Sequence, residues 1–169
     1  MRKLLFHHPT VTPAIQLSVR AALSAALAVV IASLLSFEFP LYALIAAIIV
    51  TDLSPDKTRK AGASRVIGSA LGAGVGAAFS TFLPSNPVTI GLSVAFAMVL
   101  TQVARLRDAT KLAGYVCGIT MLGHADQPWF YAFLRLLETT LGVAVAILVS
   151  FAPKLLGVDD TGKSDDSSE

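Results

Sequence analysis

The chain has 169 residues, of which 54% are apolar and only 14% charged, with a formal net charge of +2 and a mean hydropathy of +0.71. A soluble domain carries about 25% charged residues, because its surface must stay hydrated. Residues 66–104 contain no charged residue at all, and such a stretch is stable in a membrane only as a helix or within a closed barrel. The runs lack the alternation of barrel strands, so we predict an all-α integral membrane protein.

Charged residues and prolines divide the chain into six apolar blocks. A spanning helix needs about 20 residues, and the first, third, fourth and sixth blocks reach that length with their flanks. The second and fifth blocks hold only 13 and 12 uncharged residues, so they either re-enter the membrane or draw polar flanks into its interface. In chain order, the blocks cover residues 21–37, 39–51, 66–83, 88–104, 112–123 and 129–153.

The distribution of lysine and arginine predicts the topology. With six crossings and a cytoplasmic N-terminus, the inner segments hold twelve of these residues and the outer segments hold only Arg135. The positive-inside rule favours this arrangement. It also places Trp129 and Tyr131 at the outer interface, where aromatic rings are enriched. We therefore expect a multi-pass protein of the bacterial plasma (inner) membrane with both termini in the cytoplasm.

The two halves of the chain resemble each other at a shift of 70 residues. Without a gap, Asp56 falls on Asp126, Arg65 on Arg135 and Gly72 on Gly142. Because each copy holds three crossings, an odd number, the second copy must enter the membrane from the opposite side. The expected fold is therefore six transmembrane helices arranged as two inverted three-helix repeats, an architecture found in transporters.

This interpretation divides the chain into four parts. Residues 18–83 form the first repeat and residues 88–153 the second. Residues 1–17 form a cytoplasmic or interfacial N-terminal segment, and the acidic residues 154–169 form a disordered tail. The short second and fifth blocks occupy matching positions, which is the sequence sign of a central binding site in such folds.

A stripe of small residues recurs every four positions in the third block. At helical spacing these residues share one face and allow another backbone to approach closely. Tight packing is the favoured interpretation, and a narrow passage along the stripe is the alternative. Glu138 replaces a glycine in the second copy and breaks the symmetry. The predicted packing residues are Gly68, Gly72, Gly76 and Ser80, with Gly142 and Ser150 in the sixth block.

Arg65 and Arg135 lie near the beginnings of long helices, one towards each membrane face. Each is either an interfacial anchor or a site that attracts an anion, since a guanidinium binds a carboxylate in a bidentate fork. Asp52 either pairs with Arg65, takes part in proton coupling or is a plain helix-end charge. Glu138 is three residues from Arg135 and so within reach of a local pair. The predicted anion pathway comprises Arg20, Asp52, Lys57, Arg65, Arg135 and Glu138.

Other chemistry is not indicated. The pairs His7–His8 and His124–Asp126 are weak metal signals, because no third ligand accompanies either. The single Cys117 lies in an apolar run and is interpreted as a packing residue. No phosphate-binding loop and no nucleophile–base arrangement stands out. We therefore expect no enzyme, metal, cofactor or nucleic-acid partner.

Residues 39–44, 48–52 and 65–73, with Thr58 between them, resemble the core of the FUSC family. The family pattern is a short helix ending in a polar residue, a basic loop with threonine, and an Arg-x-x-Gly-Ser/Thr-x-x-Gly helix, here Arg65 to Gly72. These are fusaric acid resistance and aromatic acid exporter proteins, related to plant aluminium-activated malate channels. The resemblance implies export or permeation of organic anions such as aromatic carboxylates, with Arg65 attracting the anion.

Two departures affect the expected assembly. Many family members have a tryptophan where Tyr42 stands, and many carry a cytoplasmic domain or a second membrane half. A homo-oligomer, dimer or trimer, is therefore expected. The leading hypothesis is a transporter or channel for small organic anions in the lipid bilayer. The alternative is a non-transporting membrane scaffold or a small subunit of a larger membrane complex.

Overall fold

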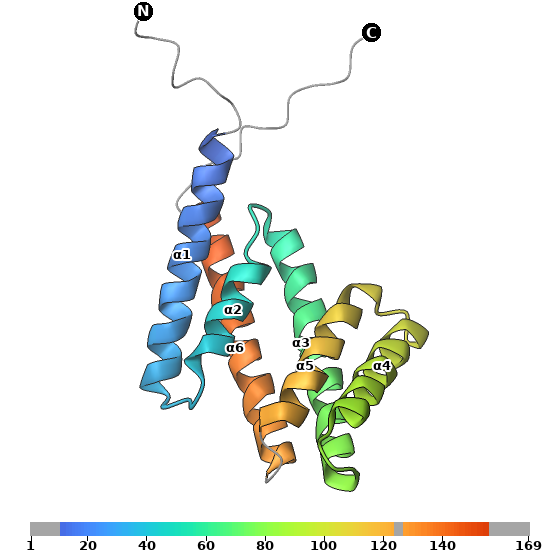
Figure 1. The fold of residues 1–169 in the computed structure, drawn as a ribbon. Coiled ribbons are helices and arrows are strands. Elements are labelled where there is room, and N and C mark those ends of the chain that lie inside the picture. Colours follow the sequence, from blue (N-terminus) through green and yellow to red (C-terminus); the bar gives the residue numbers. More distant parts are fainter. Residues whose placement is uncertain (1–10, 124–126, 156–169) are drawn as a thin grey trace, which may run out of the picture.

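The structure, a computed structural model, describes residues 11–123 and 127–155. These residues form six α-helices and one short 3₁₀ helix and contain no strand, which confirms the all-α prediction for this part of the chain (Figure 1). His7, His8, residues 124–126 and most of the predicted acidic tail lie outside the described residues. The elements are α1 (Val11–Leu34), α2 (Pro40–Val50), α3 (Pro55–Phe82), α4 (Pro87–Val103), η1 (Arg107–Ala109), α5 (Thr110–Gly123) and α6 (Pro128–Leu155).

Proline marks the beginning of four of these helices, at positions 40, 55, 87 and 128. Proline suits the first helical position, because its φ is already helical and its missing N–H is not needed there. At α4 the cap is complete: the side-chain oxygen of Asn86 accepts a hydrogen bond of 2.9 Å from the backbone N–H of Thr89. Such a cap satisfies one of the free N–H groups of the first turn.

The ends of α1 and α4 share one motif. Ser36 and Arg105 adopt the left-handed conformation, with φ of 55° and 59°. In both turns the next residue donates its N–H back across the helix end, from Phe37 to the carbonyl of Ala32 and from Leu106 to that of Thr101. This is a Schellman ending, which satisfies carbonyl groups of the last turn.

Two helices begin earlier than the apolar blocks indicate. Helix α1 starts at Val11, inside the segment assigned to residues 1–17, and α3 starts at Pro55, eleven residues before its apolar block. The basic stretch at residues 56–60 is therefore the beginning of α3 and not a loop. Hydropathy marks only the apolar part of a helix, whereas Pro55 fixes its actual start. As a result, Arg65 lies within α3, three turns from its beginning.

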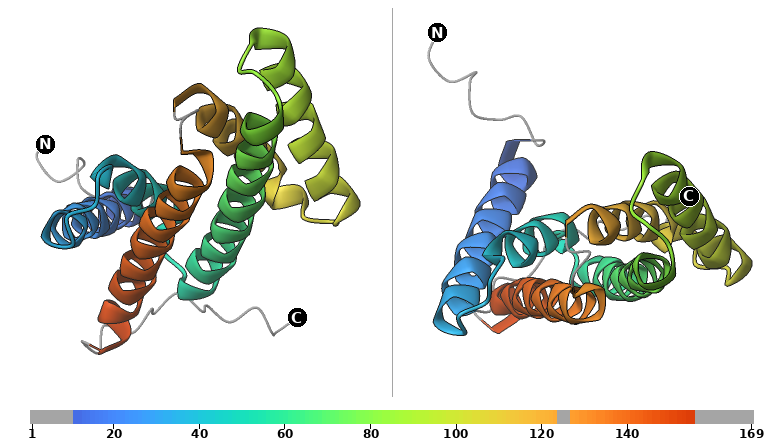
Figure 2. Two further views of the ribbon diagram at one scale, coloured as in Figure 1. Left: turned by 90° about the horizontal axis from the view of Figure 1, so that it is seen from below. Right: turned by 60° about the horizontal axis from the view of Figure 1, so that its bottom comes forward.

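The helices pack in two layers. Helices α3 and α6 lie side by side in one layer, and α2 and α5 lie on the same side of that pair (Figure 2). Helix α2 packs on α6 and α5 packs on α3, whereas α2 and α5 make no close backbone contact with each other. Helix α1 flanks α2 and α6, and α4 flanks α5 and α3. Consecutive helices run in alternating directions, so α1 and α4 run opposite ways.

Small residues bring the two layers together. Helix α3 presents its glycine stripe to α5: a methyl group on Gly72 would overlap the carbonyl oxygen of Ala113, and one on Gly76 would lie 2.8 Å from the carbonyl oxygen of Cys117. Helix α6 meets α2 in the same way, where Gly142 faces the carbonyl of Ala43. The stripe is thus closed by packing and does not line a passage.

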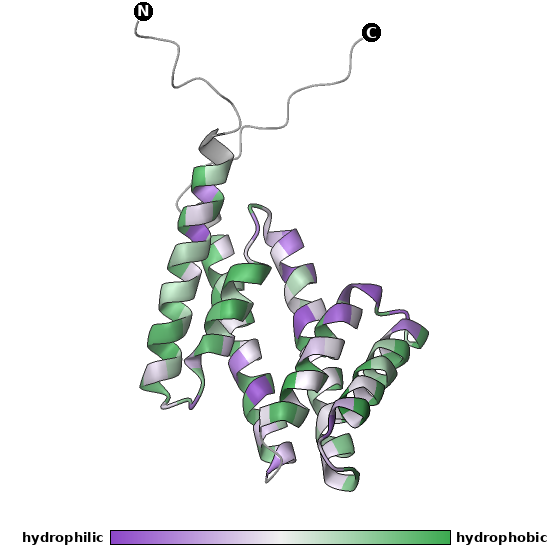
Figure 3. Cartoon of the chain, in the orientation of Figure 1, coloured by the Kyte–Doolittle hydropathy of each residue, from purple (hydrophilic) through white to green (hydrophobic). Residues whose placement is uncertain are grey.

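The outer surface is apolar over much of the molecule. Leu34, Phe82 and Val103 are each more than three quarters exposed, at 79%, 82% and 77%. Figure 3 shows polar residues gathered at the beginnings of α3 and α5, and apolar residues along α1, α2 and α4. By length and composition two segments of the described helices qualify as membrane spans, Ala14–Leu34 and Pro128–Phe151. Helices α2 and α4 are shorter and apolar, and six crossings remain a prediction.

Candidate functional site

A cavity of about 230 Å³ lies between α2 and α5, with α3 and α6 beneath it. We call it the central cavity. Both predicted arginines line it, Arg65 from α3 and Arg135 from α6. The two residues lie far apart in the sequence, and it is the packing of the two long helices that brings them to one space. The lining is Tyr42, Ile45, Ile49, Arg65, Ser69, Tyr115, Val116, Ile119, Arg135 and Thr139.

The two halves of the chain contribute equally to this lining, with five residues each. Eight of the ten form pairs separated by 70 residues, so positions that match in the sequence face the same cavity. The pairs are Ile45 with Tyr115, Ile49 with Ile119, Arg65 with Arg135, and Ser69 with Thr139. The floor is therefore polar and cationic, and the walls on α2 and α5 are mainly apolar.

A second and larger cavity, of about 540 Å³, continues from the central cavity towards the beginnings of α3 and α5. We call it the basic cavity. It shares Ile49, Arg65 and Tyr115 with the central cavity, so the two are contiguous. Lys60 and Lys111 line it as well, opposed by the single carboxylate of Asp108. Three cations against one anion give this cavity an excess of positive charge.

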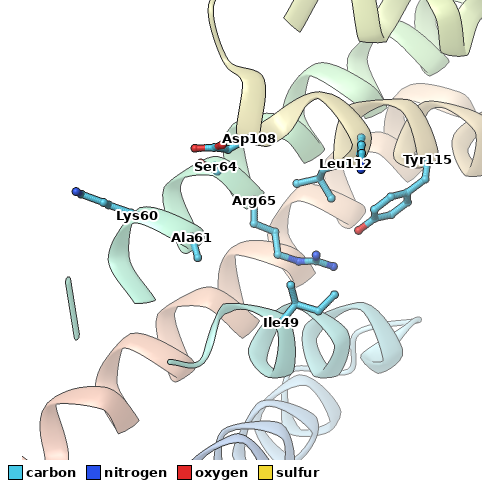
Figure 4. Close-up of a pocket in the computed structure, with 9 residues that line it drawn as sticks. Ile49, Lys60, Ala61, Ser64, Arg65, Asp108, Leu112 and Tyr115 are labelled. Carbon is cyan, nitrogen blue, oxygen red and sulfur yellow. The ribbon is translucent and has the colours of Figure 1, made fainter. Parts of the chain in front are cut away.

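Arg65 lies where the two cavities meet. Figure 4 shows its side chain extending from α3 between Ile49 of α2 and Tyr115 of α5, whereas Lys60 points away from them. The Arg65 residue is only 8% exposed, and its buried Nε atom has no hydrogen-bond partner. Buried charged groups normally have such partners. Arg65 thus presents unsatisfied donor capacity beside a cavity.

Arg135 is buried more deeply, at 3% exposed, and its surroundings are aromatic. Its guanidinium stacks on the ring of Tyr42 and lies 6.0 Å from the ring centre of Tyr131. The hydroxyl groups of the two tyrosines are 3.2 Å apart and share a hydrogen bond. The buried Nη1 atom of Arg135 has no hydrogen-bond partner. A cation over aromatic faces is stabilised electrostatically, more strongly when it is desolvated.

Glu138 is 1% exposed and lies one turn further along α6. Its Oε1 atom accepts a hydrogen bond of 3.0 Å from the backbone N–H of Phe39, at the beginning of α2, while its Oε2 atom has no hydrogen-bond partner. The carboxylate interacts with Arg135 through the electrostatic field. The local pair that the spacing suggested is thus an interaction at longer range, without a hydrogen bond between Nη1 and Oε2.

The other predicted pathway residues lie outside both cavities. Asp52 caps the turn between α2 and α3, where its carboxylate accepts a hydrogen bond of 3.0 Å from the N–H of Ser54. Arg20 reaches from α1 to the same turn and donates to the carbonyl of Leu53 at 2.7 Å. Lys57 is exposed in the first turns of α3. These three residues surround the entrance side of the molecule and do not line the cavities.

Ser69, Thr139 and Tyr115 are cavity residues that the sequence analysis did not select. Ser69 and Thr139 each stand four residues after an arginine and match each other across the repeat. Four residues is one helical turn, so each hydroxyl shares a face with its arginine. That combination was a signal available in the sequence. Tyr115 is the one hydroxylated aromatic residue of the short fifth block.

A helical bundle with an apolar exterior and buried arginines around a cavity is typical of membrane transport proteins, since intramembrane charges mark substrate pathways. The family model described as "Aromatic acid exporter family member 1" matches residues 16–152. The chain belongs to this aromatic acid exporter family, which confirms the resemblance to FUSC proteins. Family membership indicates a transporter of organic acids rather than an enzyme, and together with the apolar helices it indicates a membrane protein.

Curated relatives are bacterial. The chain is 30% identical over 117 residues to a UPF0421 protein of Bacillus cereus, covering 68% of this chain and 33% of the relative. It is 28% identical over 113 residues to a UPF0421 protein of Oceanobacillus iheyensis, covering 66% of this chain and 32% of the relative. The chain therefore spans about one third of the length of these relatives. No solved structure matches it with significance.

Proposed function

We propose that the protein forms a membrane passage for small organic anions, aromatic carboxylates or similar compounds. The observation that carries this proposal is the central cavity, on which Arg65 and Arg135 converge with guanidinium nitrogen atoms that lack hydrogen-bond partners. A guanidinium binds a carboxylate through two parallel hydrogen bonds. Low local dielectric strengthens such bonds, and the apolar walls on α2 and α5 suit an aromatic ring.

The proposed route begins at the basic cavity. Its excess positive charge attracts anions from solution, and Arg65 passes them to the central cavity because it belongs to both. The positive-inside rule favours the basic residues of α3 and α5 on the cytoplasmic side. In the proposed topology the anion thus enters from the cytoplasm, with both chain termini on that side of the bacterial plasma membrane.

The proposed scaffold is a pair of inverted three-helix repeats related by a pseudo-two-fold axis through the central cavity. Three observations support it: the matched cavity pairs, the opposite directions of α1 and α4, and a shared burial pattern. Residues 65–73 and 135–143 have the same degree of burial at all nine matched positions. Repeats of this kind place binding sites at their interface.

A homo-oligomer, dimer or trimer, completes the proposed passage. The cavities open between α2 and α5, which do not touch, and the rims of this opening are apolar: Ile49 is 60% exposed and Tyr115 is 43% exposed. An arginine floor open to hydrocarbon is unfavourable. A second copy laid over the opening would shield the arginines from lipid.

Flux of radiolabelled benzoate into proteoliposomes tests the proposal, with Arg65→Gln as the variant and Lys57→Gln as the matched control. A charge-assisted hydrogen bond contributes about 1.5–3 kcal/mol, and 1.4 kcal/mol changes a binding constant about tenfold. We expect Arg65→Gln to reduce flux by about tenfold or more, and Lys57→Gln to leave it nearly unchanged.

Absence of flux for any carboxylate, with protein shown to be folded and inserted, would contradict the proposal. The scaffold hypothesis then gains weight. It predicts that purification in mild detergent yields stoichiometric foreign subunits, whereas the passage predicts a homo-oligomer.

A further inference from the structure

The two arginines of the central cavity occupy matched positions, yet their surroundings differ at two points. Where the ring of Tyr42 lies against Arg135, the matched residue on the Arg65 side is Leu112. Where Glu138 stands three residues after Arg135, the first repeat has Gly68. Both differences add groups that hold a guanidinium on one side only. The passage therefore has two unequal ends.

At the Arg135 end, aromatic rings enclose the guanidinium. The Tyr42 ring covers it, and the Tyr131 hydroxyl is hydrogen-bonded to that of Tyr42. Phe39 completes the cluster, with its ring centre 6.1 Å from that of Tyr42 and 6.0 Å from that of Tyr131. Two of these residues belong to the beginning of α2 or its cap and one belongs to α6. The cluster thus joins the short helix to the long one at this end.

Glu138 adds a negative charge to the same cluster. It bonds the Phe39 N–H, and so holds the beginning of α2. Its second oxygen is buried without a hydrogen-bond partner, as is Nη1 of Arg135. An unsatisfied carboxylate oxygen near an unsatisfied guanidinium nitrogen neutralises part of the local charge at longer range. A carboxylate from solution that approaches Arg135 therefore meets both the ring and a resident carboxylate.

At the Arg65 end, neither obstacle is present. Leu112 and Gly68 carry no charge or ring, and the space next to Arg65 is the basic cavity of about 540 Å³. Figure 4 shows the Arg65 side chain reaching into this space, next to the ring of Tyr115. The nearest basic neighbours on the rim are Lys60 and Lys111. This arginine is accessible to an anion in the observed conformation.

We infer that Arg65 is the anion-binding subsite, and that Tyr42, Arg135 and Glu138 close the opposite end of the passage, with Glu138 as a built-in anion that a transported carboxylate must displace. This inference rests on the proposed function and assigns unequal roles to its two arginines. Glu138 is a positioning residue, because it acts through Arg135 and through the Phe39 N–H. Passage beyond the central cavity requires the Tyr42 ring to leave the guanidinium.

Two variants separate this role from simple packing. Glu138→Gln keeps the shape and an oxygen acceptor for the Phe39 N–H but removes the charge. Tyr42→Leu introduces the residue found at the matched position of the other repeat. The controls are Glu38→Gln, an exposed carboxylate near the same end, and Tyr42→Phe, which keeps the ring over Arg135. The experiment measures benzoate flux in proteoliposomes and the shift of thermal midpoint that benzoate causes in detergent.

We expect Glu138→Gln and Tyr42→Leu each to raise benzoate flux several-fold over the wild type, and both controls to match the wild type. The benzoate-induced shift should persist in these variants and disappear in Arg65→Gln, because binding occurs at Arg65. Wild-type flux combined with equal or lower flux in both folded variants would overturn the inference. A benzoate-induced shift that survives Arg65→Gln would overturn the subsite assignment. Absence of both flux and shift in every protein would instead refute the proposed function.

Discussion

The Cα atom of Gly142 in α6 lies directly against the backbone carbonyl of Ala43 in α2. A methyl group on Gly142 would overlap that carbonyl oxygen and lie 2.9 Å from the Cβ atom of Ala46. The matched glycine of the first repeat, Gly72, meets the carbonyl of Ala113 in the same way. The two short helices are thus each held against a long helix of the other repeat through a glycine–carbonyl contact.

This contact predicts that Gly142→Ala lowers stability. Overpacking of a close contact costs about 1–3 kcal/mol, and the obstacle here is backbone, which cannot rotate away. The control is Gly74→Ala in α3, where a methyl group would meet nothing within 4 Å and alanine favours the helix by about 0.5–1 kcal/mol. Thermal unfolding in detergent should show a lower midpoint for Gly142→Ala only. Equal midpoints would mean that α2 and α6 separate easily.

Thr58 connects three elements and provides a second prediction. Its hydroxyl oxygen accepts a hydrogen bond of 3.0 Å from the N–H of Asp52 and one of 3.1 Å from the hydroxyl of Ser150. Thr58→Val keeps the shape but leaves these groups unsatisfied, at about 1–3 kcal/mol for each buried group. Thr58→Ser keeps the oxygen and should stay close to the wild type in thermal midpoint. A Thr58→Val midpoint equal to that of Thr58→Ser would contradict this role.

Arg20 is expected to act as a structural anchor of the turn between α2 and α3. Its bond to the carbonyl of Leu53 is charge-assisted, and such bonds contribute about 1.5–3 kcal/mol. Arg20→Ala should therefore lower the thermal midpoint, whereas the exposed Lys57→Ala should not. The ratio of benzoate to chloride flux should be unchanged in both. A changed ratio in Arg20→Ala, with the midpoint intact, would restore Arg20 to the anion pathway.

The six proposed crossings can be tested by cysteine labelling. The single cysteine, Cys117, is fully buried, so Cys117→Ala provides the background. Single cysteines at Lys57 and Arg107 should react only with reagent on the cytoplasmic side, and those at Glu38 and Trp129 only with reagent outside. All four positions are exposed. Reaction of positions 38 and 57 from the same side would show that α2 does not cross the membrane.

The proposed oligomer predicts a cross-link through α2. In the same background, Ile49→Cys lies on the exposed rim of the cavities and should form a disulfide between copies upon mild oxidation. Val88→Cys in α4 is equally exposed, at 73% for the native residue, but lies away from this rim. It should remain monomeric on a non-reducing gel. Cross-linking at position 88 alone would place the contact between copies elsewhere.

The sequence by itself determined the helical class, the number of helices and the family. Long apolar runs without charge permit only helices, and prolines at positions 40, 55, 87 and 128 divide them. The shift of 70 residues also selected the two arginines and the two short helices that surround the central cavity. These properties depend on local composition and spacing, which a sequence displays directly.

Only the tertiary structure decided which charged residues share a space. Arg20 and Asp52 were selected with Arg65, but they hold a turn, whereas Ser69 and Thr139 face the cavity. The difference depends on how α3 and α6 rotate about their axes, and the glycine–carbonyl contacts with α5 and α2 fix that rotation. Hydropathy is blind to rotation in a helix that is apolar on most faces. The stacking of Arg135 on Tyr42 joins residues 93 positions apart, and packing alone brings them together.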